Sequence, residues 1–269
     1  MKRILTFALC ALLFGAMNAS AQKLVILHVN DTHSHLDAER SGELEGQGGV
    51  IERAAYIDSV RKAVGKKNVL LLHAGDWNQG TSYFNVLKGD LEIDLLNALK
   101  YDCVTFGNHE FDNNLEDLGR RVSKLNAKVA CANYDFSPFE LGKYVEPYRI
   151  IKRGGMKIGI VGMLCDITKV VDRSVSDRVP HLDDVTVLNK WADYLKNDQK
   201  CDLVILLSHM GYQEDMAMVP LTSNIDLVIG GHSHTLLSKM MSANDKDGRP
   251  VPVVQDWKWG LEIGRIDVY

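Results

Sequence analysis

The sequence has few cysteines, and no two of them stand in the CxxC spacing of a thiolate metal site. Five cysteines occur in 269 residues, which argues against a zinc site built from paired thiolates. Cys103, Cys131 and Cys201 adjoin apolar, strand-like runs, where free cysteine packs as a small hydrophobic residue. Together with Cys165 they could pair in one of three ways if the chain is exported, but we favour buried thiols.

Long runs of one residue type are also scarce. The 31 basic and 35 acidic residues leave a net charge of −4, and a chain without basic runs is a poor binder of long nucleic acid. Beyond residue 21 no apolar run approaches the length of about 20 residues that spans a bilayer. Internal repeats, low-complexity segments and linkers are absent as well. These absences favour a single domain that acts on a small molecule.

The first 21 residues contain the one long apolar stretch of the sequence. Met1-Lys2-Arg3 precedes an apolar run that extends to Met17, and Ala19-Ser20-Ala21 follows it. A short basic region, an apolar core and an A-x-A site are typical of a secretory signal peptide. We therefore predict cleavage after Ala21, a mature domain of residues 22–269, and a periplasmic or secreted location.

The remaining chain alternates between apolar, β-rich runs and amphipathic segments. The expected strands are 24–29, 68–73, 103–106, 128–132, 148–152, 157–164, 203–207 and 225–229. The expected helices are one from Val50 to near Gly65, then 91–99, 114–125, 183–197 and 214–219. This alternation predicts an α/β domain with a largely parallel, covered sheet. Residues 252–255 and 260–268 are expected to form a closing antiparallel pair, and 37–47, 166–181 and 242–249 to be polar loops.

Five of the predicted strands end in residues of the metal-binding type. These are Asp31 and His33, then Asp76, Asn108, His209, and finally His232 and His234. The carboxyl ends of strands line the ligand crevice of an α/β sheet, so these ends can converge. In extended backbone the D-x-H and H-x-H spacings direct both side chains of a pair to the same side. Oxygen and imidazole ligands without sulfur suit Zn, Mn or Fe.

The number of candidate ligands favours two ions over one. Seven are more than one tetrahedral zinc ion needs, and the carboxylate of Asp76 can bridge two ions. Two metals about 3.5–4 Å apart clamp a phosphoryl group for in-line displacement. They also lower the pKa of a shared water towards about 7, which provides hydroxide at neutral pH. We therefore predict a phosphoester hydrolase with two divalent ions.

In order and in residue type, these strand ends resemble the motifs of the calcineurin-like metallophosphoesterases. The block Asp76-Trp77-Asn78-Gln79-Gly80-Thr81 is similar to the extended GD block in the catalytic domain of the 5′-nucleotidase family. That family also includes UDP-sugar hydrolases and 2′,3′-cyclic phosphodiesterases. The resemblance implies two packed β-sheets flanked by helices, in four layers. It also implies a first ion on Asp31, His33, Asp76 and His234, and a second on Asp76, Asn108, His209 and His232.

The same resemblance gives His109 and Asp112 a role as a catalytic pair outside the metal shell. Asp112 would orient the imidazole of His109, which would assist the leaving alkoxide. Glu110 would support the metal loops rather than react. The sequence departs from the family at His73, where an acidic residue is common, and we expect that imidazole to be packed or supporting rather than a ligand.

The resemblance covers the whole mature chain, and the family's catalytic domain ends at the segment Trp257-Lys258-Trp259-Gly260. Family nucleotidases carry a C-terminal domain that clamps the base, and we expect a separate chain to supply it if one is needed. The predicted function is an exported hydrolase of nucleotides or related small phosphoesters. The alternatives are a phosphodiesterase or 2′,3′-cyclic nucleotide hydrolase, and a metal-binding subunit of a split nucleotidase with little activity alone.

Overall fold

The computed structural model describes residues 23–269, and the predicted signal peptide lies outside these residues. Two six-stranded sheets form the centre, in the orders β12-β1-β2-β3-β4-β5 and β10-β11-β9-β8-β7-β6. The first sheet contains β1 (Leu24–Val29), β2 (Val69–His73), β3 (Cys103–Val104), β4 (Lys128–Ala130), β5 (Val145–Glu146) and β12 (Gly264–Val268). The second contains β6 (Tyr148–Arg153), β7 (Met156–Leu164), β8 (Leu203–His209), β9 (Leu227–Ile229), β10 (Met241–Asn244) and β11 (Pro250–Val254).

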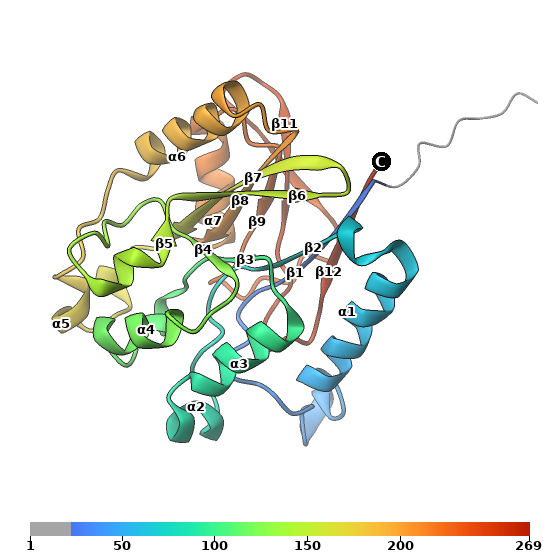
Figure 1. The fold of residues 1–269 in the computed structure, drawn as a ribbon, viewed down its shortest axis with the longest axis vertical. Helices are drawn as coiled ribbons and strands as arrows, with labels where there is room; N and C mark the ends of the chain where they lie inside the picture. The colour runs from blue at the N-terminus through green and yellow to red at the C-terminus, as the bar shows by residue number, and fades with distance from the viewer. Residues whose placement is uncertain (1–22) are drawn as a thin grey trace, which may run out of the picture.

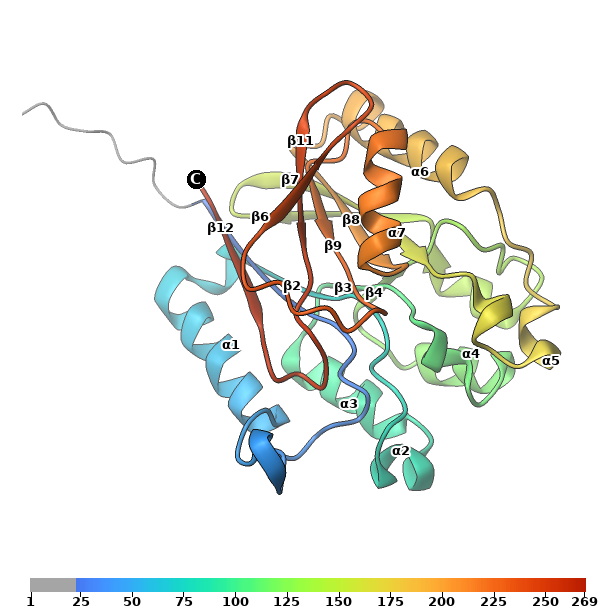
Figure 2. The same ribbon diagram turned by 180° about the vertical axis from the view of Figure 1, so that it is seen from behind.

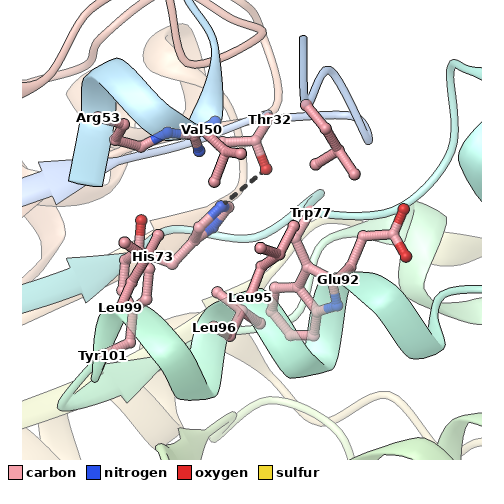
Figure 3. Close-up of a pocket in the computed structure, with 11 residues that line it drawn as sticks. Thr32, Val50, Arg53, His73, Trp77, Glu92, Leu95, Leu96, Leu99 and Tyr101 are labelled. Carbon is pink, nitrogen blue, oxygen red and sulfur yellow. Dashed lines mark hydrogen bonds between the residues drawn. The ribbon is translucent and has the colours of Figure 1, made fainter. Parts of the chain in front are cut away.

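Helices cover the outer face of each sheet. The helices in the described residues are α1 (Val50–Val64), α2 (Ser82–Leu87), α3 (Asp90–Leu99), α4 (Leu115–Val122), α5 (Arg173–Ser176), α6 (Asp184–Asp193) and α7 (Tyr212–Met218). Figure 1 shows α1, α3 and α4 on one side of the paired sheets and α6 on the other, and Figure 2 shows α7 beside α6. A small pocket lies between α1, α3 and the end of β2 (Figure 3). The predicted four-layer α/β architecture is confirmed.

The alternation of side chains along β1 explains why both faces of this strand are apolar. Val25, Leu27 and Val29 pack in the same core as Ile57 and Val60 of α1. The intervening Leu24 and Ile26 pack against the second sheet, in a core with residues of β7 and β8. Successive side chains of a strand point to opposite faces, so a strand between a helix layer and a second sheet needs apolar residues on both faces.

The predicted antiparallel pair at the end of the chain is wrong. β11 pairs in parallel with β9 in the second sheet, and its antiparallel neighbour is β10, which occupies part of the expected polar loop 242–249. β12 instead pairs antiparallel with β1, at the edge of the first sheet. The chain crosses from one sheet to the other between these strands, and proximity in sequence does not reveal that crossing.

The cysteine prediction is confirmed, since all four cysteines in the described part of the chain are free and buried. Burial in apolar surroundings raises the pKa of the Cys103 and Cys131 thiols to about 12. These side chains therefore act as packing residues.

The parallel strands bring the ends with candidate ligands to one edge of the double sheet. β1, β2 and β3 run in parallel in the first sheet, and β7, β8 and β9 run in parallel in the second. Because the two sheets pack face to face, the loops after β1, β2 and β3 meet those after β8 and β9.

Candidate metal centre

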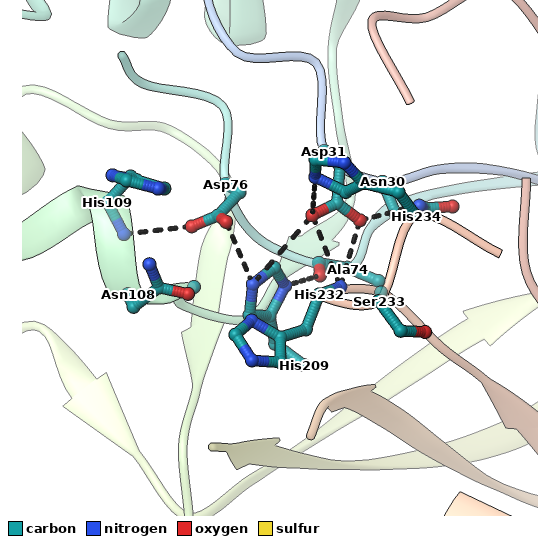
Figure 4. A network of polar contacts seen from close by, with 12 residues as sticks. Asn30, Asp31, Ala74, Asp76, Asn108, His109, His209, His232, Ser233 and His234 are labelled. Atoms are coloured by element: carbon teal, nitrogen blue, oxygen red, sulfur yellow. Dashed lines mark hydrogen bonds and ion pairs between the residues drawn. The ribbon is translucent and has the colours of Figure 1, made fainter. Parts of the chain in front are cut away.

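The structure brings the predicted ligands together at this edge, as Figure 4 shows. Two groups of residues have ligand atoms within 4.8 Å of one another, and each contains three of the four ligands expected for one ion: Asp31, His33 and His234 form one group, and Asp76, His209 and His232 form the other. A third group, His33, Asp76 and His109, joins them. Asn108 lines a surface cleft together with His33, Asp76 and His232.

Five of the seven predicted ligands have a backbone conformation that non-glycine residues rarely adopt. Their φ angles are 50° at Asp31, 48° at His33, 55° at Asp76, 73° at His232 and 50° at His234. A left-handed conformation of this kind costs on the order of 1–3 kcal/mol per residue and is retained where the surrounding structure enforces it. Such strain in residues with titratable side chains points to a function for the site.

Backbone hydrogen bonds between loops hold these conformations. The N–H groups of Asp31 and His33 donate to the carbonyl oxygens of Gly75 and Asp76, each at 3.0 Å. Gly75 has φ +86°, and a Cβ there would lie 2.6 Å from both Gly107 N and His209 Nδ1. Only glycine therefore allows the loops after β2, β3 and β8 to approach this closely.

The surroundings of His209 test whether the site fits a cation. Its Nδ1 lies 2.6 Å from the carbonyl oxygen of Ala74, which fixes the ring. Its Nε2 is buried and has no hydrogen-bond partner in the described part of the chain, yet it lies 3.1 Å from Asp76 Oδ2. A buried ring nitrogen beside a buried carboxylate is the arrangement that a divalent ion between them would satisfy.

The pKa shifts of His209 and Asp76 also indicate that the buried carboxylates are stabilised by a positive charge. Burial by itself would lower the pKa of His209, but the charges of Asp76 and Asp31 raise it to about 10. Burial would raise the pKa of Asp76, but His209 and His33 hold it below its usual range. Without an ion, a proton on His209 balances the carboxylates, and a bound cation would replace that proton.

A second pair of ring nitrogens faces the carboxylates from the other side. His33 Nε2 lies 2.9 Å from His234 Nε2, and His234 Nε2 lies 3.3 Å from Asp31 Oδ1. His33 Nδ1 contacts the carbonyl oxygen of Asn78 at 3.3 Å, which directs its Nε2 towards the centre. The residues present thus fit two ions bound by nitrogen and oxygen, and the described part places no sulfur among these groups of ligands.

His109 lies at the open side of the centre. Its Nδ1 is 2.9 Å from Asp112 Oδ2, and both side chains are about 30 % exposed, whereas His209 is fully buried. Burial opposes protonation, but the hydrogen bond with Asp112 and the charge of Asp76 raise the pKa of His109 to about 9. The adjoining cleft has a volume of about 370 Å³, which suits a small molecule.

Glu110 joins the two loops that supply Asp76 and Asn108. Its Oε2 accepts the N–H groups of Gly107 at 2.6 Å and Asp76 at 2.8 Å. Its Oε1 accepts those of Trp77 at 3.0 Å and Asn78 at 3.2 Å. One buried carboxylate therefore sets the distance between the loops after β2 and β3.

The variant Glu110→Gln should lower the free energy of unfolding by about 3 kcal/mol. Glutamine has the same shape, but its NH₂ group replaces one of the two oxygens. In either orientation of the amide, two backbone N–H groups therefore face another donor and lose their acceptor. Urea denaturation measures this change. The matched control is Glu116→Gln on α4, because Glu116 is exposed and forms a surface ion pair with Arg178. This control should shift stability by less than about 0.5 kcal/mol. Equal effects of the two variants would contradict the bridging role.

The sequence did not reveal three further contributors to this site. The N–H of Trp259 donates to the carbonyl oxygen of Asp31 at 2.6 Å. Asn30 Nδ2 contacts Asp31 Oδ2 at 2.6 Å and the carbonyl oxygen of Trp257 at 2.7 Å. Val170 lines the cleft with its side chain partly exposed. No local pattern could have identified the contacts of Trp259 with Asp31 and of Asn30 with Trp257, because these partners are distant in sequence.

None of the helices in residues 23–269 combines the length and apolar character needed to cross a bilayer. Residues 24–236 match the family model of the calcineurin-like phosphoesterases. The chain is 36 % identical over 272 residues to a snake venom 5′-nucleotidase of Naja atra, covering 91 % of this chain and 50 % of that protein. It is 35 % identical over 289 residues to a human 5′-nucleotidase, covering 98 % of this chain and 49 % of that protein.

Solved structures agree with these relatives. A 5′-nucleotidase precursor from Thermus thermophilus superposes with a TM-score of 0.84 at 32 % identity, covering 91 % of this chain and 51 % of that one. An NAD nucleotidase from Haemophilus influenzae superposes with a TM-score of 0.80 at 30 % identity, covering 91 % and 52 %. The chain thus spans about half the length of the relatives that it matches.

Proposed function

Because this chain belongs to the calcineurin-like phosphoesterase family, we propose that it is a metal-dependent hydrolase that acts on nucleoside 5′-phosphates or related small phosphoesters. The observation that supports this most directly is the arrangement at His209. Its buried Nε2 has no hydrogen-bond partner among the described residues and faces the Asp76 carboxylate, so the centre is built for cations. Export of the chain remains a prediction that rests on residues 1–21.

We assign the ligands to the two ions as the family resemblance implies. Asp31, His33, Asp76 and His234 would hold one ion, and Asp76, Asn108, His209 and His232 the other. A pair of divalent ions, when bound, lowers the pKa of water and neutralises charge on a phosphoryl group. Nitrogen and oxygen donors suit Zn, Mn or Fe.

The remaining chemistry falls to His109 and Asp112. Asp112 holds Nδ1 of the imidazole at 2.9 Å, which leaves Nε2 free to face the cleft. From there His109 would hydrogen-bond the phosphoryl group and donate a proton to the leaving alkoxide. Asp112 orients the ring and stabilises its protonated form.

The relatives and the dimensions of the cleft support the proposed substrate class. The most similar relatives described above bear the name 5′-nucleotidase, and a cleft of about 370 Å³ admits a small phosphoester. The net charge of −4 disfavours long nucleic acid.

A metal-supplemented substrate panel tests the proposal. The chain of residues 22–269, loaded with Mn²⁺ or Zn²⁺, is expected to release phosphate from AMP. The same panel includes UDP-glucose, 2′,3′-cyclic AMP, p-nitrophenyl phosphate and bis-p-nitrophenyl phosphate, which separate monoester from diester preference. An inert protein that also binds less than one ion per chain in elemental analysis would refute the proposed function.

A further inference from the structure

We propose that His73 is a positioning residue for the first metal loop, Asp31–His33, and that it acts through a hydrogen bond with Thr32. The inference rests on the proposed metal centre and concerns a residue that belongs to neither of the two ligand sets proposed above. His73 is the last residue of β2, and the sequence suggested only a packed or supporting imidazole there.

Thr32 stands between two of the predicted ligands and presents its side chain away from them. Its Oγ1 lies 3.1 Å from His73 Nε2, and both residues are buried. Figure 3 shows the pair, with His73 in the centre of the pocket and the hydrogen bond drawn to Thr32. A side chain of the neighbouring strand β2 therefore contacts the metal loop on the side opposite the proposed ions.

His73 is itself held in one orientation. Its ring packs against Trp77 at a centroid distance of 5.7 Å and against Tyr101 at 5.6 Å. Burial and the charge of Arg53 keep the pKa of His73 well below its usual range, so the ring is neutral. A neutral imidazole and a hydroxyl form one hydrogen bond in either tautomer, because each group can donate or accept.

The other side of the ring faces a cavity of about 20 Å³, lined by apolar and polar side chains, with room for one water molecule. Within the described structure, His73 Nδ1, Trp77 Nε1 and the Nε and Nη2 atoms of Arg53 are buried without hydrogen-bond partners. Glu92 also lines this cavity, and neither of its carboxylate oxygens has such a partner. A water bound here would satisfy Nδ1 and leave Nε2 to the hydrogen bond with Thr32.

The metal loop needs this contact because its backbone is strained. Asp31 and His33 have φ angles of 50° and 48°, and their N–H groups each make one hydrogen bond with the loop after β2. Between these two backbone hydrogen bonds, the side chain of Thr32 adds a third contact, its hydrogen bond with His73. Without it, the strained loop can relax, and the carboxylate of Asp31 and the ring of His33 leave their positions for the first ion.

Three variants separate the hydrogen bond from simple packing. Thr32→Val removes the hydroxyl and keeps the shape. His73→Asn presents an amide near the position of Nδ1 and loses the contact with Thr32. His73→Gln presents an amide near the position of Nε2 and keeps that contact. The readout is stepwise Zn²⁺ binding to the metal-free chain by calorimetry, together with the melting temperature of each variant.

We expect Thr32→Val and His73→Asn to weaken one of the two binding steps by about 10- to 100-fold, the size usual for residues that orient ligands. The other step should stay at the wild-type value, and His73→Gln should restore the affinity to within about 3-fold. The double variant Thr32→Val/His73→Asn should be no weaker than either single variant, because both remove one interaction.

Two results would overturn this role. Wild-type affinity in Thr32→Val and His73→Asn, even with a lower melting temperature, would make His73 a packing residue only. A His73→Gln variant as weak as His73→Asn would show that the ring rather than the hydrogen bond matters. A wild-type chain that binds no Zn²⁺ refutes the proposed metal centre itself, so the two failures are distinguishable.

Discussion

The variant Asp76→Asn is expected to bind less than one divalent ion per chain and to lose at least about 10³-fold in kcat/KM, or about 4 kcal/mol of transition-state stabilisation. Asp76 belongs to two of the three groups of candidate ligands. Its Oδ2 lies 3.1 Å from His209 Nε2 and 3.8 Å from His33 Nε2. Asparagine keeps the shape but removes the charge that both ions would share.

Elemental analysis after dialysis against Mn²⁺ or Zn²⁺ measures the first effect, and phosphate release from AMP the second. The control is Asp90→Asn at the start of α3, where the carboxylate is exposed and pairs with Arg120 and Lys124. This control removes the same charge from the surface and should keep both ions. Two ions bound to Asp76→Asn would contradict the assignment of a shared carboxylate.

The variant His109→Ala is expected to retain both ions and to lose about 10²- to 10⁴-fold in turnover of AMP, the range of a general acid. Its side chain reaches the cleft from outside the two proposed ligand sets, and Asp112 orients it at 2.9 Å. The loss should be much smaller for p-nitrophenyl phosphate, because p-nitrophenolate leaves without a proton. A nucleoside alkoxide is a far stronger base and needs one.

The chain offers a closely matched control in His181. His181 Nε2 lies 2.9 Å from Asp184 Oδ1, also three residues ahead, and the side-chain exposures resemble those of His109 and Asp112. His181→Ala should leave turnover of both substrates near the wild-type value. An equal loss on both substrates in His109→Ala, or the loss of an ion, would remove the leaving-group role.

Much of the fold could be predicted from local patterns. The run 24–29 coincides with β1, and the helix expected from Val50 to near Gly65 is α1. The exceptions lie where partners are distant in sequence. β11 and β12 have strand-like patterns, but each pairs within a different sheet. A separate omission is α2, which lies in a segment with no helix prediction.

The sequence by itself determined which residues stand at the strand ends, because strand periodicity is local and parallel strands bring their carboxyl ends to one edge. It therefore identified Asp31, Asp76 and His209 as candidates before their distances were known. Only the tertiary structure decided what holds them: Thr32 beside His73, and the backbone of Trp257 beside Asn30, 227 residues apart. The physical reason is that such contacts depend on how the two sheets pack and on where the chain crosses between them. The periodicity of side chains within one segment contains no information about the packing or the crossing.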